Sequence, residues 1–214
     1  MGTRGIYGFY RDGVDKLTYN HFDSYPEELG KNIVSFIKET TITELNQIFD
    51  RIIMVEEDSI PNLIQVYECE KYSDTSIGTG IITDWYCLLR NTQGDLNPYK
   101  EGLLYMIEYS GFIKSSLFCE WGYIINLNDN ILEIYRGFIN KPNSSNNRYK
   151  DDEPYTTDDF TLVNQNGEKT HCPKKDYYSC EMIISFPLDN IPSDWLEQTR
   201  VIAEIFDKKE ALCQ

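Results

Sequence analysis

The chain has 214 residues, of which 41% are hydrophobic and 26% charged, and it carries a formal net charge of −15 at pH 7. This is the composition of a globular protein that is long enough to bury one sizeable core. The negative charge argues against partners that need a basic surface, namely nucleic acids and anionic membranes. No apolar run reaches the length of a membrane-spanning helix.

Cysteine usage and the first residues indicate a reducing compartment. The six cysteines show no compact spacing and no Cys-x-x-Cys pair, so we expect reduced thiols rather than disulfides or a structural zinc site. His171, Cys172 and Cys180 offer three metal ligands without a fourth, and a polar loop that enters a strand is the simpler interpretation. The start of the chain lacks the segments of a secretory signal, so we expect a cytoplasmic protein. No phosphate-binding loop or dinucleotide motif occurs, and the sequence predicts neither metal nor cofactor.

A β-hairpin is predicted at the start of the chain. Residues 4–11 and 16–22 are rich in strand-forming residues, and the turn dipeptide Asp12-Gly13 lies between them. We therefore expect the two segments to pair as neighbouring antiparallel strands.

Two helices follow the hairpin in the prediction. Ser24 and Glu27 have the spacing of a capping box, and the apolar residues after them predict a helix over 26–39. Thr41 and Glu44 repeat the capping pattern, and apolar residues at helical spacing follow. The two helices are expected to be joined by a very short turn.

A third helix is predicted within residues 59–72, beginning near Pro61. Its apolar side chains at helical spacing are expected to face inward. These are Leu63, Ile64, Tyr67 and Tyr72.

The second half of the chain is expected to supply most of the sheet. The predicted elements are a helix over 84–92, strands over 103–109, 117–127, 131–138 and 178–188, and a last helix after Ser193. Residues 140–176 are polar and turn-rich, so an exposed loop is expected there. Residues 1–214 thus read as a single α+β domain, an antiparallel sheet with helices packed on it.

The densest group of polar and aromatic residues lies at the end of the predicted hairpin. Alternate strand residues share a face, so Tyr19, His21 and Asp23 are expected to point to one side. A carboxylate near an imidazole can orient it as a general base, which makes His21 and Asp23 candidate catalytic residues. A polar strand end, with Asp23 bound to main-chain amides, is the competing interpretation.

The neighbouring residues are candidates for contact with a substrate. Thr3 on the partner strand is a candidate nucleophile. The residues expected to bind substrate are Tyr19, Asn20, Tyr7 and Arg4.

Two arginines outside the hairpin, Arg90 and Arg136, are possible anion clamps, although such residues more often pair with surface acids. Cys119 lies beside Glu120, but a cysteine nucleophile needs a base or a positive field, so a buried strand cysteine is favoured there.

Two resemblances bear on this interpretation. The opening Met-Gly-Thr-Arg-Gly, the Thr-Tyr-Asn-His-Phe-Asp-Ser-Tyr-Pro segment and the later Cys-Glu-Trp-Gly-Tyr and Leu-Glu-Ile-Tyr-Arg-Gly-Phe segments resemble a family of uncharacterised proteins from bacteria, phages and fungi. That family carries no known function. The order of hairpin, two helices and strands also resembles the N-terminal-nucleophile hydrolases. This likeness implies a nucleophilic first residue, whose role only Thr3 could fill, and Met1 and Gly2 precede it.

Two functions remain open from the sequence. The first is a small enzyme or ligand-binding protein with its site at the hairpin, acting on a small molecule or peptide, with amide or ester hydrolysis as the natural reaction. The second is a non-catalytic acidic interaction protein, of the inhibitor, immunity or anti-defence type, that binds a basic protein.

Overall fold

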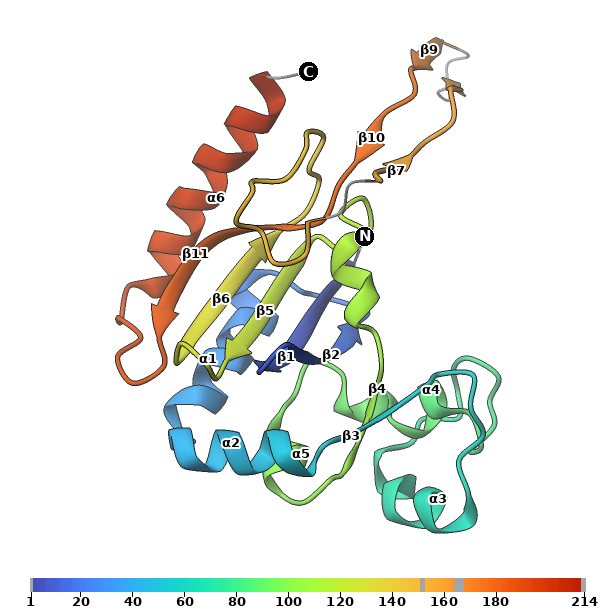
Figure 1. The fold of residues 1–214 in the computed structure, drawn as a ribbon. Helices are drawn as coiled ribbons and strands as arrows, with labels where there is room; N and C mark the ends of the chain where they lie inside the picture. Colours follow the sequence, from blue (N-terminus) through green and yellow to red (C-terminus); the bar gives the residue numbers. More distant parts are fainter. Residues whose placement is uncertain (1, 151–152, 164–167, 213–214) are drawn as a thin grey trace.

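The centre of the molecule is a five-stranded mixed sheet, seen in Figure 1 of the computed structural model. The structure describes residues 2–150, 153–163 and 168–212. In spatial order the strands are β11 (Glu181–Pro187), β6 (Ile131–Arg136), β5 (Trp121–Asn126), β1 (Gly5–Arg11) and β2 (Val14–Asn20).

The sheet contains the predicted N-terminal hairpin, a second hairpin and one parallel junction. β1 pairs antiparallel with β2, and β5 pairs antiparallel with β6. β1 and β5, however, run parallel, because the chain between them crosses from one end of the sheet to the other. The α+β class is confirmed, and the sheet is mixed rather than wholly antiparallel.

The two faces of the sheet bury different cores. Tyr7, Tyr123 and Ile134 face the larger core, which the helices cover. Ile6 and Ile124 face a smaller core, covered by residues 110–119 and by the loop before residue 150. The alternation along β1 thus sends neighbouring side chains into separate cores, as a strand buried on both faces requires.

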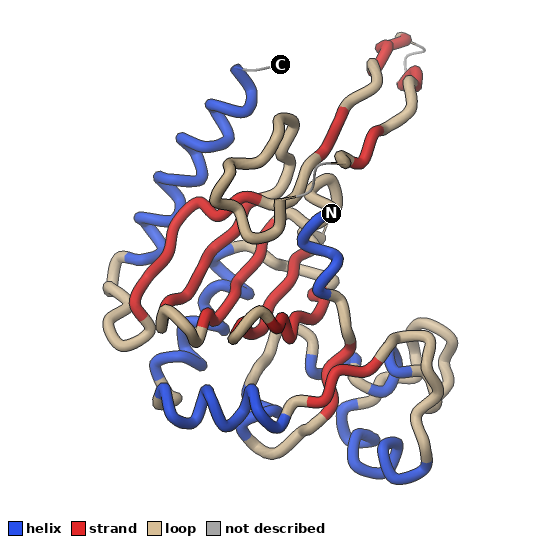
Figure 2. Tube along the Cα trace, in the orientation of Figure 1, coloured by secondary structure: helices blue, strands red, loops and turns tan. Residues whose placement is uncertain are grey.

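Helices gather on one face and at one end of the sheet (Figure 2). A single π-helical turn, Pro26–Gly30, leads into α1 (Lys31–Lys38), and α2 (Ile42–Arg51) follows. The predicted capping box of Thr41 and Glu44 is confirmed.

The capping box predicted at Ser24 is wrong. The residue before the first helical turn is Tyr25, and it makes no side-chain cap. The Ser24 hydroxyl is buried instead and accepts a hydrogen bond from Asn20 Nδ2 at 2.8 Å.

A small lobe, residues 56–93, projects from the end of the sheet; we call it the α3–α4 lobe (Figure 1). Its stem is the parallel pair β3 (Ile53–Val55) and β4 (Tyr105–Ile107). It contains α3 (Leu63–Cys69), α4 (Trp85–Leu88) and the 3-10 turns Glu70–Tyr72 and Arg90–Thr92. After the lobe come α5 (Asn97–Lys100) and a 3-10 turn over Ser110–Lys114.

The predicted inner face of α3 is largely wrong. Leu63, Ile64 and Tyr67 are exposed, whereas Cys69 is buried and Val66 and Tyr72 pack against the main core. The helix is apolar on two sides, so its periodicity alone does not reveal which side the lobe buries.

The predicted 140–176 loop is only partly irregular. It contains the short antiparallel pairs β7 (Tyr155–Thr156) with β10 (Asp176–Tyr177) and β8 (Phe160–Val163) with β9 (Lys169–Cys172). The chain ends in α6 (Trp195–Leu212), which packs along β11 (Figure 1).

Two further predictions concern the redox state of the cysteines and the presence of a membrane-spanning helix. The five described cysteines are free thiols, and Cys213 lies outside the described residues. Within the described part of the chain, no helix has the length and apolarity needed to cross a bilayer.

Candidate functional site

Tyr19 and His21 form the centre of the candidate site, at the end of the edge strand β2. Their side chains share one side of the strand, as the alternation predicts, and the Tyr19 hydroxyl lies 3.0 Å from His21 Nδ1. Tyr19 packs against the ring of Phe112 at 5.1 Å and that of Tyr109 at 5.5 Å, whereas His21 contacts Phe22 at 4.1 Å. The pair is therefore held in place by aromatic rings but remains half exposed.

The α3–α4 lobe brings a distant segment of the chain to this pair. Tyr7, fully buried in β1, donates its hydroxyl to the Thr92 carbonyl at 2.9 Å and accepts the Gly94 N–H at 2.9 Å. Gln93, held between these two contacts, accepts the His21 N–H at 3.3 Å. Residues 92–94, where the chain leaves the α3–α4 lobe, are thereby fixed against the end of β2.

This arrangement places Arg90 beside His21. The Arg90 guanidinium donates to Gln93 Oε1 and lies 5.5 Å from the Phe22 ring and 5.6 Å from the Tyr86 ring. One glutamine oxygen therefore positions both the arginine side chain and the histidine backbone.

Arg4 contributes a second positive charge, from the residue just before β1. Its guanidinium lies 5.1 Å from the Phe118 ring and interacts with Tyr19. Burial, then Arg90 and then Arg4 hold the pKa of His21 below its usual value, and burial raises the pKa of Tyr19 against the opposing charge of Arg4. At neutral pH the imidazole and the phenol are therefore both uncharged.

Neither arginine of the site pairs with an acid among the residues that the structure describes. Arg11, Arg136 and Arg148 pair with Asp50, Asp207 and Glu133, and Arg200 pairs with Glu27. Arg51 donates to the Tyr99 carbonyl at 3.2 Å. Two unpaired guanidiniums beside one imidazole stand out in a chain whose net charge is −15. Of the two possible anion clamps in the sequence, Arg136 is thus a structural partner, and Arg90 is available for a ligand.

Three of the residues expected in the site serve the fold instead. Tyr7 uses both hydrogen-bonding roles of its hydroxyl on the backbone of residues 92–94. Asn20 is buried and donates to Ser24 and to the Phe22 carbonyl. The Thr3 side chain is only 1% exposed, which keeps it from a substrate in this conformation.

Asp23 does not join the histidine. The backbone of Asp23 has φ 52°, in the left-handed region, and its carbonyl accepts the Leu29 N–H at 3.2 Å. Because β2 ends at Asn20, the alternation of the strand no longer holds at this residue. The described structure contains no hydrogen bond between the exposed Asp23 carboxylate and His21.

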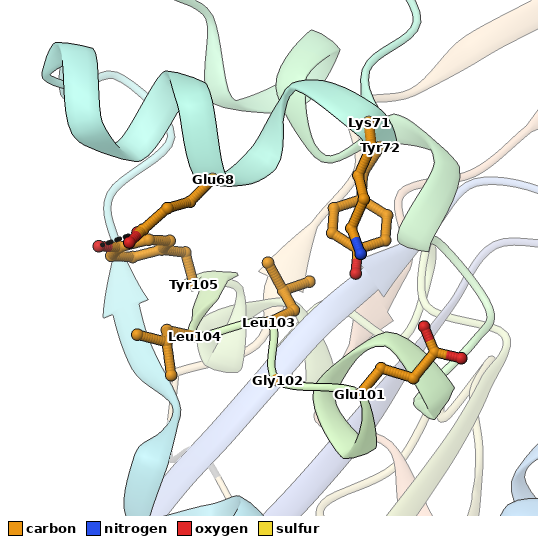
Figure 3. Close-up of a pocket in the computed structure, with 8 residues that line it drawn as sticks. All are labelled: Glu68, Lys71, Tyr72, Glu101, Gly102, Leu103, Leu104 and Tyr105. Atoms are coloured by element: carbon orange, nitrogen blue, oxygen red, sulfur yellow. Dashed lines mark hydrogen bonds between the residues drawn. The ribbon is translucent and has the colours of Figure 1, made fainter.

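A cavity of about 200 Å³ at the base of the lobe is a weaker candidate (Figure 3). It lies between the end of α3 and residues 101–105. At one end the Tyr105 hydroxyl donates to Glu68 at 3.1 Å, and the Glu101 carboxylate is on the side of the Lys71 ammonium. The charged residues of its lining are two acids, Glu68 and Glu101, and one base, Lys71, so the cavity offers no excess positive charge to an anion. No cluster of three or more metal-ligating side chains occurs among the described residues.

Comparison of the chain with protein-family models, with curated proteins and with solved structures gives no match. The candidate site therefore stands on its own geometry, and both resemblances noted from the sequence stay predictions.

Sequence reasoning did not find the contributions of Gln93 and Tyr86. Both lie more than sixty residues from β2, and no local spacing links them to His21. The one available signal was Arg90, an arginine inside a short apolar segment that contains no acid after Asp84.

Proposed function

We propose that this chain binds a small ligand that carries a carboxylate or phosphate group, at the edge of the sheet between Arg4, Arg90, Tyr19 and His21. The observation that supports it is the pair of half-buried guanidiniums that form no ion pair with an acid in the described part of the chain. A cation that is partly removed from water loses hydration, and an anion restores the balance through charge-assisted hydrogen bonds.

The surrounding rings favour a ligand with a flat apolar part. Phe22, Tyr86, Tyr109 and Phe112 lie around the polar groups, and the rings of Phe22 and Tyr86 flank the Arg90 guanidinium. An aryl or similarly planar group next to the anion would bury its surface against these rings.

We further propose that the site hydrolyses an ester or amide bond of that ligand. A neutral imidazole whose Nδ1–H is donated to the Tyr19 oxygen leaves Nε2 free to take a proton from water. The water oxygen then bonds to the carbonyl carbon, the carbon–oxygen or carbon–nitrogen bond breaks, and the leaving group takes the proton from the imidazolium. Arg4 and Arg90 would hold the anionic part of the ligand and the charge that develops on the carbonyl oxygen.

Binding is tested by following the His21 ring protons by NMR as a function of pH, with and without benzoate or inorganic phosphate. An anion bound beside the imidazole favours its charged form, so the pKa of His21 should rise when the ligand is added. The double variant R4Q/R90Q should lose this response, and R51Q, which removes an exposed arginine elsewhere, should keep it. An unchanged pKa at millimolar ligand in the native protein would contradict the proposal.

Hydrolysis is tested separately with mono-p-nitrophenyl glutarate and with glutaryl-p-nitroanilide, an ester and an amide that each carry a carboxylate. H21Q should lose at least about a hundredfold in rate, the usual contribution of a general base. H171Q, at the other histidine of the chain, should retain the native rate. Equal rates in H21Q and H171Q would contradict the proposed hydrolysis, and the proposal of anion binding would stand without it.

A further inference from the structure

α3 exposes apolar side chains on its outer side, and Ile60, just before the N-cap Asn62, is exposed as well. We call these residues the α3 ridge: Ile60, Leu63, Ile64 and Tyr67. Their side chains are 82%, 88%, 68% and 82% exposed. Leu63, Ile64 and Tyr67 lie on one side of the helix, because positions three and four apart are neighbours on a helix surface, and Ile60 precedes the helix. Large apolar side chains that gather in this way mark interaction surfaces more often than ordinary solvent-facing helix.

The ridge is held rigidly. Asn62 caps the helix by accepting the N–H groups of Ile64 and Gln65 at 2.9 and 3.1 Å, and Gln65 closes the capping box by accepting the Asn62 N–H at 2.8 Å. On the opposite side, Cys69 is fully buried and Val66 packs against the main core. The exposed side chains therefore sit on a fixed backbone, which lowers the entropic cost of docking.

The surroundings of the ridge are strongly acidic. Lys71 is the only basic residue between Arg51 and Arg90. Five exposed acids flank the ridge in the chain: Glu56, Glu57, Asp58, Glu68 and Glu70. Helical spacing places Glu68 one turn beyond Ile64, where its carboxylate also accepts the Tyr105 hydroxyl, so exposed acids follow the apolar residues in the chain as well as precede them. We call these acids the acidic rim.

This charge pattern selects the occupant. A second copy of the chain, docked through the same surface about a two-fold axis, would set the acidic rims against each other. An anionic bilayer would be repelled by the same rim. A partner surface with an apolar centre and a basic border would complement both the apolar side chains of the ridge and the acids that flank it.

We infer that the α3 ridge docks an amphipathic helix of a partner protein, one whose apolar face is bordered by lysine or arginine. The apolar side chains of that helix would pack between Leu63, Ile64 and Tyr67, and its basic residues would lie opposite the acidic rim. The ridge is a surface distinct from the arginine–histidine site, so each can be tested without the other.

The test measures binding of a fluorescein-labelled helical peptide of about 18 residues, with leucine on one face and lysine on the others, by anisotropy at about 0.15 M salt. A peptide of the same composition in scrambled order and one with glutamate in place of lysine serve as probes of pattern and charge. The patterned lysine peptide should bind best. The variant L63S/I64S should weaken its binding by at least about tenfold.

Two further variants make the result decisive. V201S/I205S removes two exposed apolar residues from one side of α6 and should leave binding unchanged. I60S/Y67S probes the same ridge without touching Leu63 or Ile64, and should reproduce the loss. Binding that is equal in all variants, or equal for the scrambled peptide, would overturn the inference, because charge alone would then explain it. A native dimer in sedimentation that L63S/I64S dissociates would also overturn it, with a second copy as the occupant.

Discussion

Two arginine clusters in this protein differ in how their positive charge is compensated. In the interior, Arg148 binds Glu133 through two nitrogens, Nη1 at 3.0 Å from Oε1, and lies 3.8 Å from the Tyr10 ring centroid. Glu133 also accepts hydrogen bonds from Asn126 at 2.8 Å and Tyr135 at 3.0 Å. Both charges of this pair are compensated, and of the guanidinium nitrogens only the buried Nε lacks a hydrogen-bond partner among the described residues.

The cluster at the end of β2 is built differently. Arg4 and Arg90 face aromatic rings, a neutral imidazole and a glutamine. Among the described residues no carboxylate forms an ion pair with either of them, although hydrogen bonds from Ser76 and, to a smaller extent, the charge of Arg90 lower the pKa of Asp74. The internal network ties the loop before residue 150 to the sheet, which is a structural role. Compensated charge thus stabilises the fold at Arg148, whereas the guanidiniums without an ion pair at the end of β2 mark the place where we propose that a ligand binds.

The largest effect should come from breaking the internal pair. E133A removes the carboxylate and leaves the half-buried Arg148 guanidinium without its counter-charge. We expect the free energy of unfolding to fall by about 3 kcal/mol or more, as measured by urea denaturation. A loss below about 1 kcal/mol would show that water compensates the guanidinium and that the network is not structural.

A smaller loss is expected from Y149F, which removes the hydroxyl that donates to Asp15 at 2.7 Å. The free energy of unfolding should fall by about 1 kcal/mol at pH 7. Burial already raises the pKa of Asp15, and the Tyr149 bond lowers it, so the variant raises that pKa further. The folded state then holds the Asp15 proton to higher pH than the unfolded chain, and stability is lost as pH rises through this range. The difference in the free energy of unfolding between the native chain and Y149F should therefore shrink as the pH is lowered. A difference that grows at low pH would contradict a stabilising hydrogen bond from Tyr149 to the Asp15 carboxylate.

The ion pair of Arg136 with Asp207 is more exposed to solvent than the pair of Arg148 with Glu133. Asp207 lies 3.0 Å from Arg136 and its side chain is 48% exposed. Solvent screens such a pair, so D207A should cost about 0.5 kcal/mol in the same urea experiment. A loss as large as that of E133A would mean that exposure does not separate the two pairs.

The smallest stability effect is expected at the site itself. R90Q should change the free energy of unfolding by no more than about 0.5 kcal/mol, because no acid is left unpaired. It should also raise the pKa of His21, since one of the nearby cations is removed. A depressed histidine pKa means that the unfolded chain binds more protons, so stability falls as pH drops through the usual histidine range near 6.5. R90Q should lose less stability than the native chain between pH 7 and 5.

NMR titration of His21 and urea unfolding at both pH values check this last prediction. R51Q is the matched control, because the Arg51 guanidinium donates to the Tyr99 carbonyl and not to a residue of the candidate site. A pKa of His21 that falls or stays constant in R90Q would show that Arg90 does not act on the imidazole.

The helices show how far local sequence information reaches. Both α2 and α3 begin with a capping box and carry apolar residues at helical spacing, and both were predicted as helices. α2 buries Leu45, Ile48 and Phe49, whereas α3 leaves Leu63 and Ile64 exposed. Capping and spacing act within one turn of the chain, so they determine that a helix forms. They do not determine which of two apolar sides the rest of the protein covers.

The same division holds for the candidate site. The amino-acid sequence by itself determined the hairpin and the shared side of Tyr19 and His21, because strand alternation is a local property. Only the tertiary structure decided the rest: the left-handed turn that separates Asp23 from His21, the burial of Thr3, and the contacts of Tyr7 that bring Arg90 and Gln93 to β2. The contacts of Tyr7 with Thr92 and Gly94 join segments more than eighty residues apart, and the Asp23 turn lies beyond the end of the strand, so strand alternation encodes neither.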